Sequence, residues 1–433
     1  MADASIDTIS GLCGFRESVM PSGLSVLTDY LPPEIIRPQS VVFIYFWAGN
    51  WHDLRNMYGL AHITEHKALE RSSAFMTREE LFRQRDALGA YFNAETRELS
   101  TRYLAKVLDP NLFPTLELLL KQALFPKLDR DELETEKGVI QEEIRRYKAN
   151  PEVYPELRAK GIVFGVEPFS LYGLGSVEGV ANITREDILD FRTRYYTPDN
   201  ATVVVISPYD YGHGPLEARA DRFHDDIVRI VSQYFDRLPK FNGHRPGPRT
   251  HRIEIDGPTF AHDDIGYDNV YLARATQNGA AYGNVNDLGT WLLSIILNNR
   301  FNDQAREIGG MAYEAKCEFT RYPENFLLIK TSCHPLNLPR VERLIEQMQG
   351  DLSLYVPEQE FLLQQEVLRS TVQRKYRLGT SGIRAHLDQR LGIGSAYAEQ
   401  MAQINALTPY DVVAGAQHLF AKPYAHFTLG KRQ

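Results

Sequence analysis

Apolar residues along the chain form two similar series of predicted strands and helices. In the first series, the runs SGLSVLTDYL at 22–31 and SVVFIYFWAGN at 40–50 predict two strands. The second run is rich in Val, Ile, Phe and Tyr, which favour buried strands. The segment YGLAHITEHKALERS then has a composition that suits a helix, and it is followed by strands near 91–107 and helices from 111 onward. The first half of the chain therefore predicts strands followed by a run of helices.

The second series repeats this order. It predicts strands at 251–257 and 269–277, followed by a long helix at 286–309. Two more strands are predicted at 313–322 and 325–333, then helices from 338 onward and a last strand around 426–430. Strands followed by runs of helices are typical of an α+β fold rather than of a doubly wound parallel sheet. We therefore predict two similar α/β-roll halves, each an antiparallel sheet covered by helices.

A cluster of Gly and Pro separates the two series. The stretch KFNGHRPGPRTH, at 240–251, lies between the two structured patterns, and such clusters mark connections between elements. We accordingly expect an N-terminal domain at 1–240 and a related C-terminal domain at 241–433. A chain of 433 residues is long enough for more than one hydrophobic core.

Composition narrows the class of protein. A net charge of −8, with acids and bases mixed along the chain, argues against a nucleic-acid binder, for which a basic face is expected. Three cysteines, Cys13, Cys317 and Cys333, are too few for a disulfide framework and indicate reduced thiols. The sequence contains neither an apolar run of about 18 residues nor an evident leader, so we expect a cytoplasmic protein without a membrane span.

Two histidines four residues apart carry the most specific chemistry. In His62-Ile-Thr-Glu65-His66 both imidazoles project from one helix face, where they can share a metal ion. Glu65 lies beside them and can deprotonate an attacking water, which is the role of the glutamate in metallopeptidase motifs of this kind. The order His-x-x-Glu-His is that of an inverzincin. Taken alone, the motif is also compatible with two solvated histidines on a polar helix face.

A catalytic zinc ion usually has three protein ligands, so a third residue must come from elsewhere. The segment 131–149 is a helix candidate in which Glu136 and Glu143 are seven residues apart and share one face. Glu142 competes with Glu143 as the third ligand, because a shift of one residue is compatible with the pattern.

These residues resemble the family of pitrilysin, insulin-degrading enzyme and mitochondrial processing peptidase. Seventy-six residues separate His66 from Glu143, which is the spacing of the third ligand in that family. The resemblance implies one Zn²⁺ per chain held by His62, His66 and Glu143, with Glu65 as the base and Glu136 orienting the site. It also implies the processing-peptidase-like metallohydrolase fold, in a short two-domain member of bacterial type.

The resemblance extends over roughly residues 10–430 and implies further site residues. ALGAYFNAETRELSTRYLAKVL is similar to the family's substrate-binding strand pair, in which Asn93 and Ala94 bind the substrate backbone. NNRFNDQAREIGGMAYEAKCEF is similar to the junction where Arg306 and Tyr313 contact the scissile peptide. The sequence departs from the family in KALERSS after the motif and in Glu95 and Arg97, which bear on substrate preference.

The sequence thus predicts a zinc endopeptidase that cleaves unfolded peptides. Only the first half carries the metal motif, so the second half is expected to be a wall without metal that contributes substrate contacts. The resemblance implies a clamshell chamber formed by a homodimer, or by a heterodimer with a related chain. Two alternatives stay open: a catalytically silent scaffold or peptide-binding relative, and a protease dedicated to removing one leader peptide.

Overall fold

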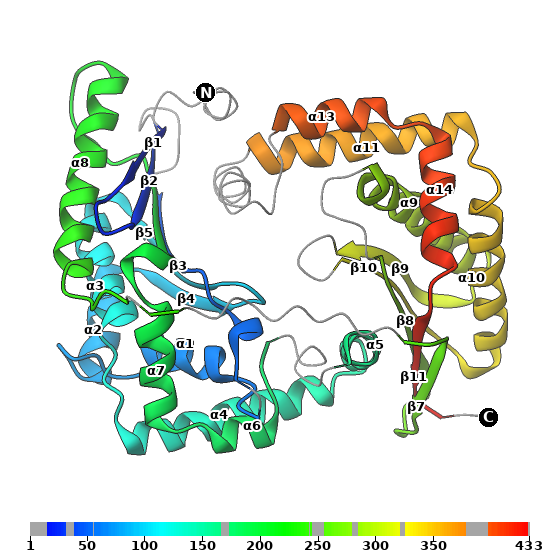
Figure 1. Ribbon diagram of the computed structural model, residues 1–433, viewed down its shortest axis with the longest axis horizontal. Coiled ribbons are helices and arrows are strands. Elements are labelled where there is room, and N and C mark those ends of the chain that lie inside the picture. Colours follow the sequence, from blue (N-terminus) through cyan, green and yellow to red (C-terminus); the bar gives the residue numbers. More distant parts are fainter. Residues whose placement is uncertain are drawn as a thin grey trace. The chain divides into compact units, whose positions relative to one another are not determined.

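The described residues of the chain form two compact units. The computed structural model describes residues 15–31, 39–54, 56–165, 173–241, 243–244, 255–278, 285–320, 325–377 and 397–431. Within these ranges, the N-terminal unit comprises 15–145 and 173–244, and the C-terminal unit comprises 146–165 and 255–431 (Figure 1). The expected division at residue 240 left 146–165 in the first half, whereas these residues pack with the C-terminal unit.

The N-terminal unit is built on a six-stranded sheet. Its strands lie in the order β1 (Phe15–Val19), β2 (Ser25–Tyr30), β6 (Ala201–Ser207), β3 (Gln39–Phe46), β5 (Thr101–Leu108) and β4 (Tyr91–Thr96). Neighbouring strands are antiparallel except for β2 and β6, which run parallel. Among the strands that the structure describes, β4 pairs only with β5, so it forms an edge of this sheet.

The C-terminal unit contains a five-stranded sheet. Its order is β7 (Thr259–Asp263), β11 (Tyr424–Leu429), β8 (Val270–Gln277), β10 (Phe326–Cys333) and β9 (Ala312–Thr320). Only β7 and β11 run parallel, and β9 is an edge strand. The expected strand at 251–257 lies mostly outside the described residues.

Five strands of each sheet follow the same topology. The order β2-β6-β3-β5-β4 corresponds to β7-β11-β8-β10-β9. Of these five strands in each unit, the last one along the chain lies parallel to the first, as β6 does to β2 and β11 to β7. This correspondence confirms the predicted fold class of two similar halves. The parallel pair was not expected, and it arises because the last strand returns from the helices beside the first strand. β1, which pairs with β2, was also missing from the sequence prediction.

Helices cover the sheets. The N-terminal unit contains α1 (Leu60–Leu69), α2 (Arg78–Leu88), α3 (Leu112–Leu124), most of α4 (Arg130–Lys148), α6 (Val177–Asn182), α7 (Arg185–Tyr195) and α8 (Leu216–Phe235). The C-terminal unit contains α5 (Tyr154–Phe164), α9 (Val285–Phe301), a π-helix (Asn302–Ile308), α10 (Leu338–Leu352), α11 (Glu358–Arg377), α13 (Tyr397–Ala406) and α14 (Pro409–Phe420). Side-chain caps fix where several of these helices begin. At the start of α7, for example, the Thr184 hydroxyl accepts a hydrogen bond from the Asp187 amide.

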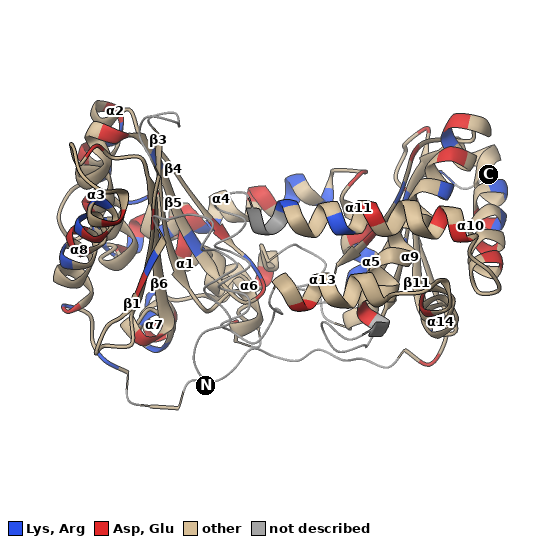
Figure 2. Cartoon of the chain, turned by 90° about the horizontal axis from the view of Figure 1, so that it is seen from above, with Lys and Arg blue, Asp and Glu red and all other residues tan. Residues whose placement is uncertain are grey.

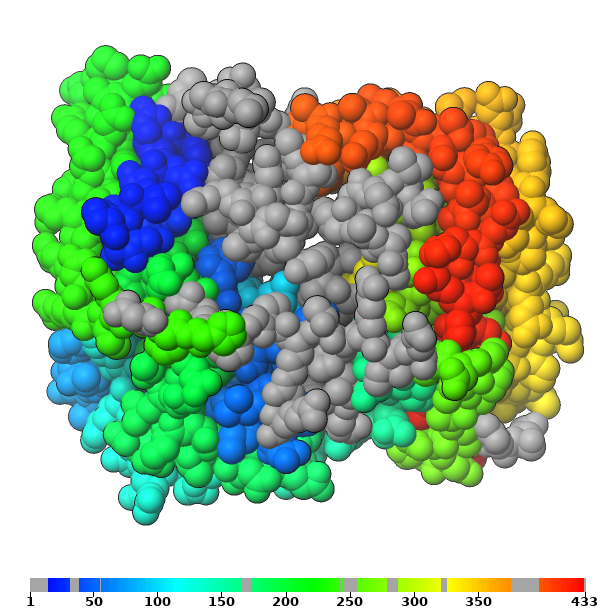
Figure 3. Space-filling model, in the orientation of Figure 1, coloured from blue at the N-terminus to red at the C-terminus, as the bar shows by residue number. Residues whose placement is uncertain are grey.

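Each unit has its own core. In the N-terminal unit, α3 and α8 pack on the sheet, and Arg16 of β1 pairs with Asp221 of α8 at 2.6 Å, so that these distant segments lie side by side (Figure 3). In the C-terminal unit, α9 and α14 pack on one face of the sheet, where Leu327 and Ile329 join the core.

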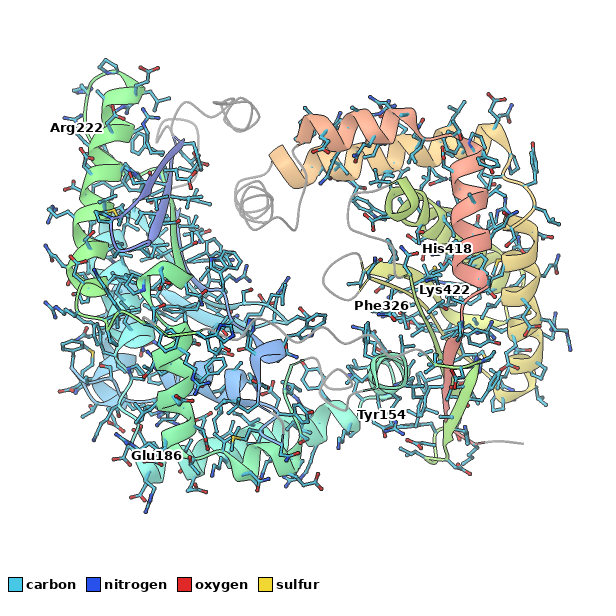
Figure 4. All side chains as sticks on the ribbon, in the orientation of Figure 1. Tyr154, Glu186, Arg222, Phe326, His418 and Lys422 are labelled. Atoms are coloured by element: carbon cyan, nitrogen blue, oxygen red, sulfur yellow. The ribbon has the colours of Figure 1, made fainter. Side chains whose placement is uncertain are left out.

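The opposite face of the C-terminal sheet is covered by α5. Phe164 of α5 contacts Phe326, and Tyr154 contacts Phe427, with ring centroids 5.9 Å apart in both pairs (Figure 4). Since side chains alternate along a strand, Phe326 projects to the opposite face from Leu327. This sheet is therefore sandwiched between helices, one of which comes from the first half of the sequence.

The surface charge is mixed. Acidic and basic residues are interspersed along the helices rather than gathered on one element (Figure 2). Cys317 and Cys333 are buried free thiols, and Cys13 lies outside the described residues. None of the described helices is long and apolar enough to cross a membrane.

Candidate metal centre

The helix that carries the histidine motif begins at a tightly fixed turn. Gly59, the residue before α1, has φ 107°, a conformation that favours glycine. The buried Asp53 accepts the amides of Gly59 and Ala61 at 2.7 and 2.8 Å, and so satisfies two donors at the start of the helix. A Cβ on Gly175 would approach Gly59 N to 2.5 Å, so the loop at residues 173–179 packs closely against this turn.

The structure brings His62, His66 and Glu143 together. The two imidazole rings lie 4.4 Å apart between centroids, and Nε2 of each ring is 3.9 Å from Oε2 of Glu143. One ligand atom from each residue lies within 4.8 Å of the others. Among the described residues this is the only such group of three or more His, Cys, Asp or Glu side chains. Two imidazole nitrogens and one carboxylate, partly buried, form a donor set that fits zinc.

The two candidate glutamates on α4 point in different directions. The Glu142 side chain is 73% exposed and accepts a hydrogen bond from Arg145 at 2.8 Å. Glu143 is 25% exposed and faces the histidines. The geometry therefore favours Glu143 as the third ligand.

Glu136 supports the site from behind. Its carboxylate is 1% exposed, and Oε1 lies 2.8 Å from Nδ1 of His66, while Oε2 accepts a hydrogen bond from Arg71. A carboxylate on the outer nitrogen of an imidazole ligand fixes the ring orientation and leaves Nε2 free for a metal. The arrangement agrees with the orienting role that the family resemblance implies for Glu136.

Glu65 lies beside the ligand group. Its Oε2 is 4.0 Å from Nε2 of His62 and accepts a hydrogen bond from the Thr96 hydroxyl of β4 at 3.2 Å. Burial raises the pKa of Glu65 to about 7, although His66 and Thr96 act in the opposite direction. A carboxyl group with a pKa near neutrality can both take up and release a proton in this pH range.

The two histidines differ in their electrostatic surroundings. Burial and the neighbouring His66 lower the pKa of His62 well below its usual value, which favours the neutral imidazole that binds metals. Burial also disfavours the charged form of His66. The hydrogen bond that His66 donates to Glu136 and the charges of nearby carboxylates outweigh the effect of burial and raise the pKa of His66 to about 9. Binding of a metal ion to His66 therefore requires the loss of a proton from its imidazole ring.

Asn93 and Ala94 lie in the middle of β4. Asn93 is exposed and pairs across the sheet with Leu104, while Ala94 is half-buried opposite Tyr103. Because β4 is an edge strand, one side of its backbone is available for pairing with another strand. β4 also ends at Thr96, which bonds to Glu65, so the same strand connects this edge with the motif helix.

Arg306 and Tyr313 belong to the C-terminal unit. Arg306 lies in the π-helix, where its side chain is 54% exposed and its Nε is 3.3 Å from Glu307. Tyr313 is the second residue of the edge strand β9 and is 81% exposed. Both side chains are therefore accessible on their own unit.

Sequence reasoning missed the residues that fix α1 in place. Asp53 had a weak signal, because an acidic residue shortly before a helix often caps it. The hydroxyl of Thr96 and an ion pair between Lys67 and Glu132, at 2.8 Å, had none. These contacts join residues 31 and 65 positions apart in the sequence.

Comparison with known proteins shows that this chain is similar to zinc peptidases. The model of the family described as insulinase, peptidase family M16, matches residues 33–163. The chain is similar to an uncharacterized zinc protease of Mycobacterium tuberculosis, with 25% identity over 96% of this chain and 93% of the relative. It is 27% identical to an uncharacterized zinc protease of Mycobacterium leprae, over 78% of this chain and 73% of that protein. The beta subunit of the mitochondrial-processing peptidase of Saccharomyces cerevisiae is 26% identical, over 54% of this chain and 47% of that subunit.

Solved structures extend the similarity to both units. A protease from Helicobacter pylori has a TM-score of 0.79 at 18% identity, covering 96% of this chain and 99% of that chain. A structure described as the inactive M16 peptidase domain of Pseudomonas fluorescens has a TM-score of 0.77 at 17% identity, covering 97% and 98%. At these identities the likeness establishes the fold.

Proposed function

The chain belongs to peptidase family M16, and we propose that it is a zinc-dependent endopeptidase that cleaves unfolded peptides. One observation carries the proposal: His62, His66 and Glu143 place their ligand atoms within 4.8 Å of one another, beside the buried Glu65. That combination supplies both a metal-binding group and a proton acceptor, which are the two requirements of metal-assisted peptide hydrolysis.

Each residue of the proposed site has a distinct task. His62, His66 and Glu143 would hold one zinc ion per chain, and Glu136 would keep the His66 ring oriented. Zinc, when bound, supplies a Lewis acid that polarises a carbonyl group and acidifies water. Glu65 takes the proton from the attacking water and returns it to the leaving amine, for which a pKa near 7 is well suited.

The edge strand β4 would bind the substrate. An extended peptide can add to the free side of β4 around Asn93 and Ala94 through main-chain hydrogen bonds. Thr96 links the end of this strand to Glu65, which supports a substrate position close to the base. Recognition through the main chain requires an extended substrate, and this favours unfolded peptides over folded proteins.

The second unit would contribute contacts to the reacting peptide. Arg306 and Tyr313 are exposed hydrogen-bond donors, suited to stabilising negative charge on the scissile carbonyl oxygen. We propose that two chains form a homodimeric clamshell, in which the Arg306 and Tyr313 pair of one chain serves the metal site of the other. A heterodimer with a related chain is the alternative arrangement.

Two alternative functions remain testable. A silent scaffold or peptide-binding relative would share the fold, as the structure described as an inactive domain illustrates. The presence of both histidines, Glu65 and Glu143 favours the active enzyme. A protease dedicated to one leader peptide would have the same site, and its substrate range would distinguish it.

The decisive experiment is mass spectrometry of a diverse peptide library after incubation with the zinc-loaded protein. We expect internal cleavage of many unstructured peptides, and cleavage by the Glu65→Gln variant that is slower by roughly 10²-fold or more. An intact library with a protein that binds zinc would favour the silent relative. Cleavage of a single sequence motif would favour the dedicated maturation protease.

A further inference from the structure

Besides the metal ligands, α1 and α4 are joined by a buried ion pair. Nζ of Lys67, in the last turn of α1, lies 2.8 Å from Oε2 of Glu132 in the first turn of α4. The Lys67 side chain is fully buried, and Glu132 is 24% exposed. The other carboxylate oxygen of Glu132 accepts the hydroxyl of Ser72 at 2.7 Å. Glu132 is therefore bonded at both oxygens to the end of the motif helix and the residues that follow.

A second ion pair lies one helical turn further along α4. Glu136 bonds to Arg71, which follows α1, and to His66. The backbone adds a third connection, because the Lys127 amide, shortly before α4, donates to the Ser72 carbonyl at 2.8 Å. We call the Lys67–Glu132 and Arg71–Glu136 contacts the ion-pair ladder. It ties the start of α4 to the end of α1.

The spacing on α4 links the ladder to the third ligand. Residues 132, 136 and 143 are four and seven positions apart, so they share one face of the helix. Glu143 follows Glu132 by eleven residues, which is about 16 Å along the axis at 1.5 Å per residue. A small rotation or shift of α4 at the ladder would therefore move the Glu143 carboxylate away from the two histidines.

A buried lysine is an unusual way to join two helices. Burying a charge is unfavourable unless a partner compensates it, and removing one partner of a buried pair is strongly destabilising. An apolar side chain at position 67 could fill the same space, but it could not select one register of α4. A charged pair can, because only one alignment brings the ammonium and the carboxylate into contact.

We propose that Lys67 and Glu132 are a positioning pair, which sets the rotation and register of α4 on α1 and so brings Glu143 to the metal ligands. This inference rests on the proposed zinc site. It assigns to the departure in KALERSS a function in metal affinity, and it makes Glu143, rather than His62 or His66, the residue through which the pair acts.

The test measures the zinc dissociation constant by chelator competition for four proteins: wild type, Lys67→Met, Glu143→Gln and the double variant. Changes that disturb the surroundings of metal ligands typically weaken metal affinity about 10-fold to 100-fold. We expect Lys67→Met to weaken zinc binding by about 10-fold in the wild-type background. In the Glu143→Gln background it should change the affinity by less than about 2-fold, because the ligand that the pair positions is already lost.

Each other result overturns the positioning role. Equal losses in both backgrounds would mean that Lys67 acts through the histidines or through general destabilisation. No loss in the wild-type background would mean that α4 is positioned without the pair. A wild-type chain that binds no zinc would overturn the proposed function itself, which separates the two failures.

Two further variants distinguish loss of the ion pair from a general folding defect. Glu132→Gln removes the charge from the partly exposed partner and should reproduce the loss seen with Lys67→Met, again only when Glu143 is present. Glu134→Gln is the matched control, because Glu134 on the same helix pairs at 2.8 Å with Lys137 of α4 rather than with α1. We expect wild-type zinc affinity for Glu134→Gln, and a loss equal to that of Glu132→Gln would overturn the proposal.

Discussion

The first α-helix after β3 in the N-terminal unit and the first α-helix after β8 in the C-terminal unit occupy the same place in the topology but bury different side chains. α1 buries His62, Glu65 and Lys67 within ten residues. Its counterpart α9 packs leucines and isoleucines, among them Leu292 and Ile296, into the core. One position in the fold therefore accommodates either an apolar helix or a reactive one.

The buried polar side chains of α1 and α9 differ in where their bonding partners come from. The polar side chains of α1 are compensated by α4, whose Glu132 and Glu136 pair with Lys67, Arg71 and His66. In α9 the buried Ser294 has a local partner, since its hydroxyl donates to the Trp291 carbonyl at 2.7 Å. A reactive helix can thus be buried only where a neighbouring helix supplies the opposite charges.

The largest effect is expected from removing a metal ligand in the N-terminal unit. Purified wild-type protein should contain about one zinc per chain, because a site with three protein ligands holds one ion. His66→Ala or Glu143→Gln should reduce the zinc content strongly and abolish hydrolysis. Metal analysis of the purified variants checks this, and undiminished zinc would contradict the assignment of ligands.

The matched control lies in the corresponding helix. Ser294→Ala removes a buried polar group from α9, at a cost of about 1 kcal/mol for one hydrogen bond. It should leave both zinc content and turnover unchanged. A loss of zinc in this variant would break the distinction between the two helices.

Glu65→Gln separates the proton acceptor from the ligands. The substitution is nearly isosteric, so zinc should be retained, while hydrolysis should fall by roughly 10²-fold or more because a general base is lost. Steady-state kinetics together with metal analysis provide the measurement. Turnover at the wild-type rate would show that another group activates the water.

Tyr313→Phe tests whether the unit without metal takes part in the reaction. Loss of one neutral hydrogen bond to the reacting carbonyl, about 1.4 kcal/mol, should slow hydrolysis roughly 10-fold without changing zinc content. The readout is kcat/KM with a reporter peptide. An unchanged value would remove Tyr313 from the site.

Mixing two impaired variants tests the proposed exchange between chains. Glu65→Gln and Tyr313→Phe subunits should form mixed dimers in which one site has both residues intact. If the residues act across the dimer, symmetry counting gives about a quarter of wild-type activity from that site, above the residual rate of the Tyr313→Phe protein. Native mass spectrometry must confirm that the subunits exchange. Exchanged dimers without this gain would place both residues in the same chain.

The last test concerns the stability of the fold, where no effect on zinc binding is expected, and uses two aspartates on matching strands. Asp29 of β2 is 1% exposed, its Oδ1 has no hydrogen-bond partner among the described residues, and burial raises its pKa from 3.8 to about 6. A raised carboxyl pKa means that the folded state disfavours the charged form, so stability falls as pH rises through 4 to 6. Asp29→Asn should raise the unfolding free energy at pH 7 by about 3 kcal/mol, and the gain should vanish below pH 4.

Asp263 of β7 provides the control for this prediction. It accepts the Tyr154 hydroxyl at 2.9 Å, so Asp263→Asn keeps a hydrogen-bond acceptor and should change stability by less than about 1 kcal/mol. Urea unfolding at pH 4 and pH 7 measures both variants. A gain for Asp29→Asn that is independent of pH would contradict the electrostatic cause.

The sequence was most informative where the chemistry is local or periodic. The i, i+4 spacing of His62 and His66 and the shared face of Glu136 and Glu143 follow from helix geometry, and the structure gathers these side chains as the pattern predicts. The strands from β3 to β5 and from β8 to β10 were likewise predicted close to their observed positions. The signal was clearest for β3, in which residues 41–46 are all β-branched or aromatic.

Contacts between distant segments could not be read in the same way. The Lys67–Glu132 pair joins residues 65 positions apart, and nothing in either local sequence specifies the other. The placement of α5 on the C-terminal sheet depends on the fit of Phe164 against Phe326, which is a property of the folded chain. The choice between Glu142 and Glu143 likewise needed the orientation of α4.

The crossing of the chain at α5 has a consequence for folding and for dissecting the protein. α5 ends at Phe164, whereas β11, which it contacts through Phe427, begins only at Tyr424. During synthesis the sheet that α5 covers is complete only after β11 has been made, so the apolar side chains of α5 stay without their partners until then. A fragment ending at residue 240 would carry this helix without its partner strands. A soluble fragment of the metal-binding half would therefore need polar replacements on α5, and the two halves cannot be produced by a single cut.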